Sequence, residues 1–192
     1  GLQLVDTKDW NVRLNASYNT NHNKVLSIGN AVPFAIGGFS SRTVQTVVAE
    51  GEPVGFIRGY KAVLNPDNSL KEILPLQNLG STLPTAYGNF SLSASYKNLS
   101  FMLSGDYQYG AYVHSFDRQF RFSKGLKDDA IPEKALEGLD QGANWLNFTN
   151  FFVEKSDFLK IRNIGIAYDY KPKKYLKSVN LAFNVYNPFA FT

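Results

Sequence analysis

The sequence contains no cysteine and no long apolar run. Without cysteine there can be no disulfide scaffold, no cysteine nucleophile and no thiolate metal site. A transmembrane helix needs about eighteen or more consecutive apolar residues, so none is predicted. The first residues lack a basic region followed by an apolar core, so no signal peptide is visible. We therefore expect either a mature chain or a piece of a longer one.

Recognisable catalytic motifs are missing as well. The histidines, His22 and His114, have no partner at metal-ligand spacing. There is no Gly-x-Ser-x-Gly elbow and no Gly-rich phosphate loop. We therefore expect no enzyme, no cofactor and no bound metal. The net charge of +4 is small and dispersed, and the lysines of 171–177 resemble a solvated turn, so no nucleic-acid partner is predicted.

Alternating apolar and polar residues dominate what remains. Aromatic residues make up 15% of the chain and favour strands. The pattern predicts about seven strands, at 10–19, 42–49, 54–64, 89–97, 100–113, 158–170 and 179–185. One short helical turn is expected within 132–140.

The connections between these segments alternate between short and long. Short corners are expected at 51–53, 97–98 and 171–174, with long segments between them. Membrane barrels have short turns at one rim and long loops at the other, whereas soluble domains use short connections of about five residues. The polar positions hold mainly Asn, Ser, Asp and Gln, with few charges, which suits a wet barrel lumen. The sequence therefore predicts an all-β fold, a wall of a transmembrane antiparallel β-barrel.

Three stretches resemble the C-terminal part of SusC/RagA-type TonB-dependent outer-membrane transporters. They are "VVAEGEPVGFIRGYKAV" at 47–63, "LGSTLPTAYGNFSLSASYKNLSFMLSGDYQYG" at 79–110, and "SDFLKIRNIGIAYDYKPKKYLKSVNLAFNVYNPFAFT" at 156–192. The Asp-rich stretch that usually follows the first in that family is reduced here to "NPDNS" at 65–69. A calcium-like site there is therefore not expected.

The resemblance implies that 1–192 is a C-terminal portion of a larger barrel of about 22 strands, without the plug domain and the final strand. It implies a bacterial outer membrane location, a SusD-like surface lipoprotein and TonB as partners, and an oligosaccharide or oligopeptide as the transported nutrient. Two alternatives stay open: a plug-free porin or adhesin barrel, and a soluble carbohydrate-binding β-sandwich.

Two groups of residues are candidates for contacts with ligand, partner or lipid. Aromatic and basic residues of one expected loop can grip a sugar or peptide; these are Tyr112, His114, Phe116, Arg118, Phe120 and Arg121. They can equally pack the loops against each other or against a lid. Residues expected to face the bilayer, mostly as an interfacial girdle, are Trp10, Tyr18, Tyr96, Tyr168 and Phe183.

Overall fold

A computed structural model describes residues 1–38, 44–172 and 177–192. The chain forms two compact units. The first, called here the sheet unit, consists of Gly1–Thr20, Thr85–Tyr109 and Asp157–Thr192. The second, the mixed unit, consists of Asn21–Pro84 and Gly110–Ser156.

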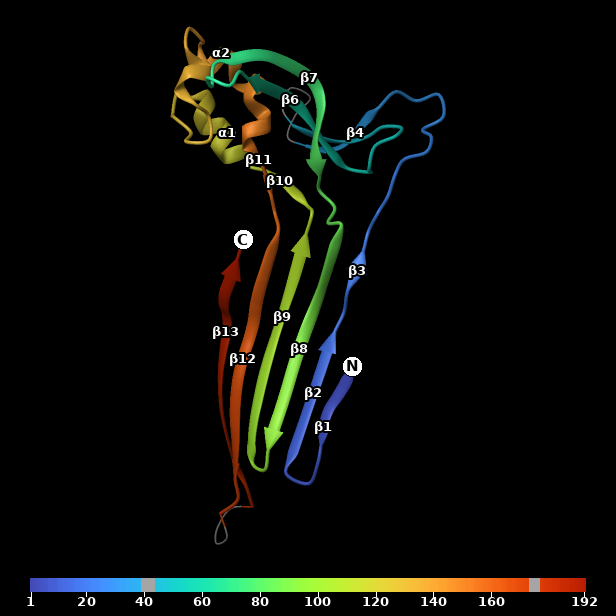
Figure 1. Cartoon of the computed structure of the whole chain (residues 1–192), viewed down its shortest axis with the longest axis vertical. Helices are drawn as coiled ribbons and strands as arrows, with labels where there is room; N and C mark the ends of the chain where they lie inside the picture. The colour runs from blue at the N-terminus through green and yellow to red at the C-terminus, as the bar shows by residue number, and fades with distance from the viewer. Residues whose placement is uncertain (39–43, 173–176) are drawn as a thin grey trace. The chain divides into compact units, whose positions relative to one another are not determined.

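The sheet unit is one antiparallel sheet of long strands in the order β1-β2-β8-β9-β12-β13, with the short β3 also paired to β8 (Figure 1). Its strands are β1 (Leu2–Asp6), β2 (Trp10–Ala16), β3 (Asn19–Thr20), β8 (Ala86–Tyr96), β9 (Leu99–Tyr109), β12 (Phe158–Tyr170) and β13 (Val179–Phe191). The hairpins β1–β2, β8–β9 and β12–β13 turn at the same end of the sheet, which we call the turn end. Alternation along each strand gives the sheet one apolar and one polar face.

The mixed unit combines small sheets with short helices. A four-stranded sheet has the order β4-β5-β6-β7, and β10 pairs with β11. The elements are β4 (Phe34–Gly38), β5 (Gln45–Val48), β6 (Phe56–Leu64), β7 (Leu70–Ser81), β10 (Tyr112–His114), α1 (Phe116–Ser123), the 3-10 helix η1 (Glu133–Leu136), α2 (Gln141–Asn144), the 3-10 helix η2 (Trp145–Phe152) and β11 (Val153–Lys155).

The hydrophobic core lies in the mixed unit. Phe122 of α1 packs against Phe148 and Phe152 of η2, with ring centroids 5.8 and 5.6 Å apart. Among the described residues, every fully buried hydrophobic side chain belongs to this unit. The sheet unit instead leaves large apolar side chains exposed, such as Phe183 at 67%. Nothing within the described residues covers its apolar face.

The expected fold class, an antiparallel β-barrel wall, agrees with this architecture, but two predicted strands were assigned to the wrong sheet. Segments 42–49 and 54–64 correspond to β5 and β6, which belong to the mixed unit; residues 42 and 43 lie outside the described residues. Their alternation reflects a sheet with one side packed on helices, and this has the same period of two as a barrel stave. The corner at 51–53 is therefore a turn of the mixed unit.

Other predicted boundaries agree more closely, except that the strand predicted at 100–113 ends at Tyr109 as β9, and residues 112 and 113 belong to β10 of the mixed unit. The strand predicted at 158–170 is β12, and the turn at 97–98 joins β8 to β9. In the corner predicted at 171–174, residues 173 and 174 lie outside the described part. The sequence predicts a long loop between β9 and β12, but the segment folds into β10, α1, η1, α2, η2 and β11.

Candidate functional site

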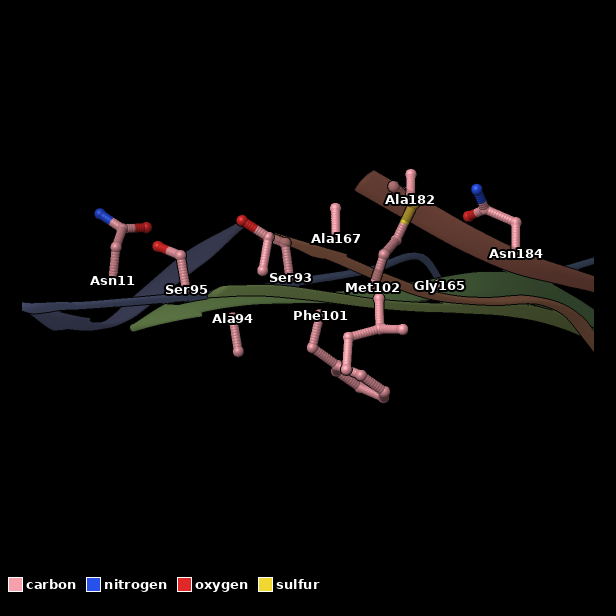
Figure 2. A pocket seen from close by; sticks show the side chains of 12 residues that line it. Asn11, Ser93, Ala94, Ser95, Phe101, Met102, Gly165, Ala167, Ala182 and Asn184 are labelled. Atoms are coloured by element: carbon pink, nitrogen blue, oxygen red, sulfur yellow. The ribbon is translucent and has the colours of Figure 1, made fainter. Parts of the chain in front are cut away.

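The polar face of the sheet unit presents mostly small, uncharged side chains over neighbouring strands. One cross-strand row consists of Asn11, Ser95, Ser100, Ala167 and Ala182. The next row consists of Arg13, Ser93, Met102, Gly165 and Asn184. Apart from Arg13, the residues of the two rows line a shallow hollow of about 300 Å³. Figure 2 shows Ser93, Ser95 and Asn184 projecting on one side of the sheet, with Ala94 and Phe101 on the other.

This surface is suited to contact rather than to covalent chemistry. Hydroxyl and amide groups both donate and accept hydrogen bonds, so they can contact water, sugars or peptide groups alike. Serine and alanine leave the backbone close to the surface. At Gly165 a Cβ would collide with Asn184 Oδ1, so these two residues fit closely together.

One arginine on this face, Arg162, is paired with a carboxylate of the neighbouring strand. Arg162 occupies a bulge in β12, where the register shifts between Ile161 and Asn163 against both neighbouring strands. Its guanidinium binds Asp106 through two nitrogens, with Nη2 donating to Asp106 Oδ2 at 2.9 Å. Nη1 donates to Asn187 Oδ1 at 3.3 Å. The bulge therefore directs the arginine onto Asp106, so that Arg162 of β12 is bonded to both neighbouring strands, β9 and β13.

The opposite face carries the residues predicted to contact lipid. Trp10, Tyr96 and Tyr168 lie in one cross-strand row near the turn end. The rings of Trp10 and Tyr96 are 4.6 Å apart. Phe183 pairs with Ile166 in the adjacent row. Tyr18 lies between β2 and β3, towards the other end of the strands, and is 71% exposed.

The six residues of the predicted ligand loop lie on a strand and a helix rather than on a loop. Tyr112 and His114 belong to β10, and the other four belong to α1. Among the described residues, Tyr112, His114 and Phe116 line a mostly apolar hollow of about 510 Å³, together with residues of β4, β5 and β6. The structure therefore brings three of the six together at one hollow.

His114 belongs to a buried polar network that the sequence analysis missed. Gln119 is fully buried, and its amide nitrogen donates to the Trp145 carbonyl at 3.2 Å and to Thr149 Oγ1 at 3.0 Å. Gln119 Oε1 is thus left to accept from His114 Nε2, at 2.6 Å. Burial lowers the pKa of His114, and the bond to Gln119 opposes that effect. In the sequence, the burial of Gln119 is indicated only by its spacing from Phe122, which places both residues on one face of a helix.

The remaining three candidates have other surroundings. Arg118 donates to both carboxylate oxygens of Asp128, at 2.9 and 2.5 Å, and also pairs with Glu154. Phe120 is 46% exposed and lies under the ammonium of Lys124, 5.1 Å from the ring centroid. Arg121 borders a separate, polar hollow of about 370 Å³ that Arg118 also lines.

The described part of the chain contains neither a metal-ligand cluster nor a long apolar helix. No group of three or more His, Cys, Asp or Glu residues there could hold a metal ion. No helix there is long and apolar enough to cross a membrane.

Comparison with solved structures identifies chains with the same fold. A RagAB peptide importer in a closed-closed state matches 99% of this chain and 25% of its own, with 16% identity and a TM-score of 0.68. A RagAB peptide transporter structure gives 19% identity and a TM-score of 0.66 over 99% of this chain and 24% of its own. The open-open state of the importer gives 16% identity and a TM-score of 0.65, again over 99% of this chain and 24% of its own. No protein-family model and no curated protein matches the sequence.

These likenesses concern the fold. The chain spans about a quarter of the length of the structures it matches, and the sequence identity is low. Both units of the chain are included in the alignment, because it covers nearly all residues.

Proposed function

We propose that the chain forms part of the barrel wall of a bacterial outer-membrane, TonB-dependent importer of large nutrients. The importer would work with a SusD-like surface lipoprotein and transport an oligopeptide or a glycan. The observation that carries this proposal is the alignment of 99% of the chain with a peptide importer about four times as long. The chain itself would perform no covalent chemistry.

The two faces of the sheet unit support a position in a membrane wall. The apolar face has no cover within the described residues, and a soluble sheet with such a face would be exposed to aggregation. Trp10 and Tyr18 lie roughly 27 Å apart along the strand, at about 3.4 Å per residue. That spacing is comparable with the apolar band of about 25 Å between the aromatic girdles of outer-membrane barrels.

The opposite face supports a role in lining a lumen. Its small hydroxyl and amide groups can exchange hydrogen bonds with a passing polar substrate without holding it tightly. In the mixed unit, the hollow beside Tyr112, His114 and Phe116 offers an apolar contact for a substrate side chain or sugar ring. Peptides are the first substrates to test, because the matched structures are named as peptide importers.

The test is fractionation followed by uptake. The full-length protein that carries this chain should remain in the outer membrane after a carbonate wash, and a tagged copy should co-purify with a surface lipoprotein. Cells should accumulate labelled oligopeptides or oligosaccharides, and an uncoupler of the proton-motive force should abolish accumulation. Uptake that persists with the uncoupler would indicate a passive porin instead. Recovery in the aqueous phase without detergent would exclude the membrane assignment.

A further inference from the structure

The turn end of the sheet unit carries exposed lysines on all three hairpins. Lys8 lies between β1 and β2, Lys97 between β8 and β9, and Lys171 and Lys177 between β12 and β13. Figure 1 shows these hairpins at one end of the sheet. Within the described residues, none of the four forms an ion pair. In the mixed unit some lysines are paired, Lys127 with Glu133 and Lys134 with Asp67.

One of these lysines contacts the aromatic row directly. The Lys97 ammonium lies 5.1 Å from the centroid of the Tyr96 ring, which in turn packs on Trp10. Tyr168 belongs to the same cross-strand row. Lysine stems that lie along apolar surface and keep the ammonium in water are typical of a membrane interface.

Three acidic residues lie at the same end, but within the described residues none of them forms an ion pair with these lysines. Asp6 accepts a hydrogen bond from Asn11 Nδ2 at 3.3 Å, and Asp169 accepts one from Asn180 Nδ2 at 2.7 Å. Asp9 forms no ion pair within the described part of the chain. The turn end therefore presents four unpaired ammonium groups directly beside an apolar surface.

We propose that the turn end binds the headgroups of anionic phospholipids, with the four lysines contacting the phosphates and the row of Trp10, Tyr96 and Tyr168 contacting the glycerol and the upper acyl chains. A lipid, rather than a soluble anion, fits because the cations and the uncovered apolar face are contiguous. The inference rests on the proposed function, since it requires a bilayer against that face. Juxtamembrane lysines attract anionic lipid, by roughly fivefold in binding per residue.

The experiment uses the full-length protein extracted in detergent and offered equal amounts of phosphatidylglycerol and phosphatidylcholine. Native mass spectrometry counts the lipids that stay bound. The unchanged protein should retain phosphatidylglycerol preferentially, and this preference should weaken at high salt. Replacing Lys8, Lys97, Lys171 and Lys177 by glutamine should reduce the preference at least tenfold.

A matched variant controls for the change in charge. Lys24, Lys61, Lys124 and Lys155 are exposed lysines of the mixed unit, and Lys124 also lies 5.1 Å from an aromatic ring centroid. Glutamine at these four positions should leave the lipid preference unchanged. An unaltered preference in the turn-end variant, or an equal loss in both variants, would overturn the inference. A protein that needs no detergent and binds neither lipid would instead refute the membrane location itself.

Discussion

Asn150 forms two hydrogen bonds with the backbone of Ala62: the Ala62 N–H donates to Asn150 Oδ1 at 2.8 Å, and Asn150 Nδ2 donates to the Ala62 carbonyl at 3.3 Å. The side-chain amide thus acts as a strand neighbour for β6 beyond the end of its pairing with β5. Ala62 is only 4% exposed, so water cannot easily replace these bonds. The pair connects η2 to the sheet of the mixed unit.

Replacing Asn150 by leucine should therefore destabilise the mixed unit. The buried Ala62 N–H and carbonyl would lose their partners, at a cost of about 1–3 kcal/mol. Trp145 is the only tryptophan of this unit, so its fluorescence during denaturation, in a Trp10→Phe background, reports the unfolding. Within the described residues, the Asn147 side chain donates only to the Asn144 side chain, and Asn147→Leu should cost less than about 1 kcal/mol. Equal losses in both variants would contradict the role given to Asn150.

The pair of Arg118 and Asp128 predicts an acid-sensitive mixed unit. Hydrogen bonds from Arg118 hold the pKa of Asp128 below its ordinary value of 3.8, and burial opposes this effect. A carboxyl with a lowered pKa in the folded state stabilises that state above its unfolded pKa. The contribution is lost as the pH falls below about 4 towards the lowered value.

Arg118→Gln should therefore lower the unfolding midpoint of the mixed unit at pH 7 and reduce its change between pH 7 and pH 3. Trp145 fluorescence measures both midpoints. Arg121→Gln is the control, because Arg121 contributes least to the lowered pKa of Asp128. If the Arg118 variant kept the full pH dependence of the unchanged protein, another carboxyl would be responsible.

The sequence predicted the sheet unit better than the mixed unit, for physical reasons. In β12 each side chain faces either an apolar or a polar surface along the whole strand, so the period of two is clear and the predicted range agrees with Phe158–Tyr170. In α1, the spacing of Phe120 and Phe122 also resembles a strand. The helix is favoured by contacts of Phe122 with Phe148 and Phe152, which are distant in sequence.

The candidate site was predictable only in part. Aromatic and basic residues of 112–121 are visible in the sequence, and three of them meet at one hollow. Arg118 does not line that hollow and instead pairs with Asp128 and Glu154. Glu154 is distant in sequence, so the sequence alone does not indicate this pairing. The buried Gln119 resembles any surface glutamine until its partners Thr149 and Trp145 are known.

Gly88 allows a close approach of two strands in the sheet unit. A Cβ at this position would collide with the Ser17 carbonyl oxygen and with Tyr107 Oη, which itself donates to that oxygen at 3.1 Å. Gly88→Ala should therefore force β8 away from the Ser17 segment, at a cost of roughly 1–3 kcal/mol. Trp10 fluorescence in a Trp145→Phe background measures the unfolding midpoint in detergent.

Tyr107→Phe separates the collision from the hydrogen bond. This variant removes only the bond to Ser17 and should cost about 0.5–1.5 kcal/mol. The double variant with Gly88→Ala should remain as unstable as Gly88→Ala alone, because the collision with the Ser17 carbonyl persists. If Tyr107→Phe restored the stability of the Gly88→Ala variant, the collision with the tyrosine side chain, rather than with the Ser17 backbone, would be the cause of its instability.

Phe101 and Met102 are adjacent residues of β9 that lie on opposite faces of the sheet. Figure 2 shows Phe101 and Met102 pointing to opposite sides, and they are 38% and 49% exposed. If the apolar face contacts lipid, Phe101→Arg places a charge in the bilayer. The cost is roughly 2–4 kcal/mol at the middle of the membrane and falls towards its interfaces. Met102→Arg places the same charge in the lumen.

We therefore expect Phe101→Arg to reduce the amount of folded protein in the outer membrane, with a lower unfolding midpoint in detergent or lipid. Met102→Arg should assemble at nearly the normal level, since the polar face can accommodate a hydrated charge. Heat-dependent mobility in gels distinguishes folded from unfolded protein in both variants. The reverse order would place lipid on the polar face, and equal tolerance of the two charges would mean that neither face contacts lipid.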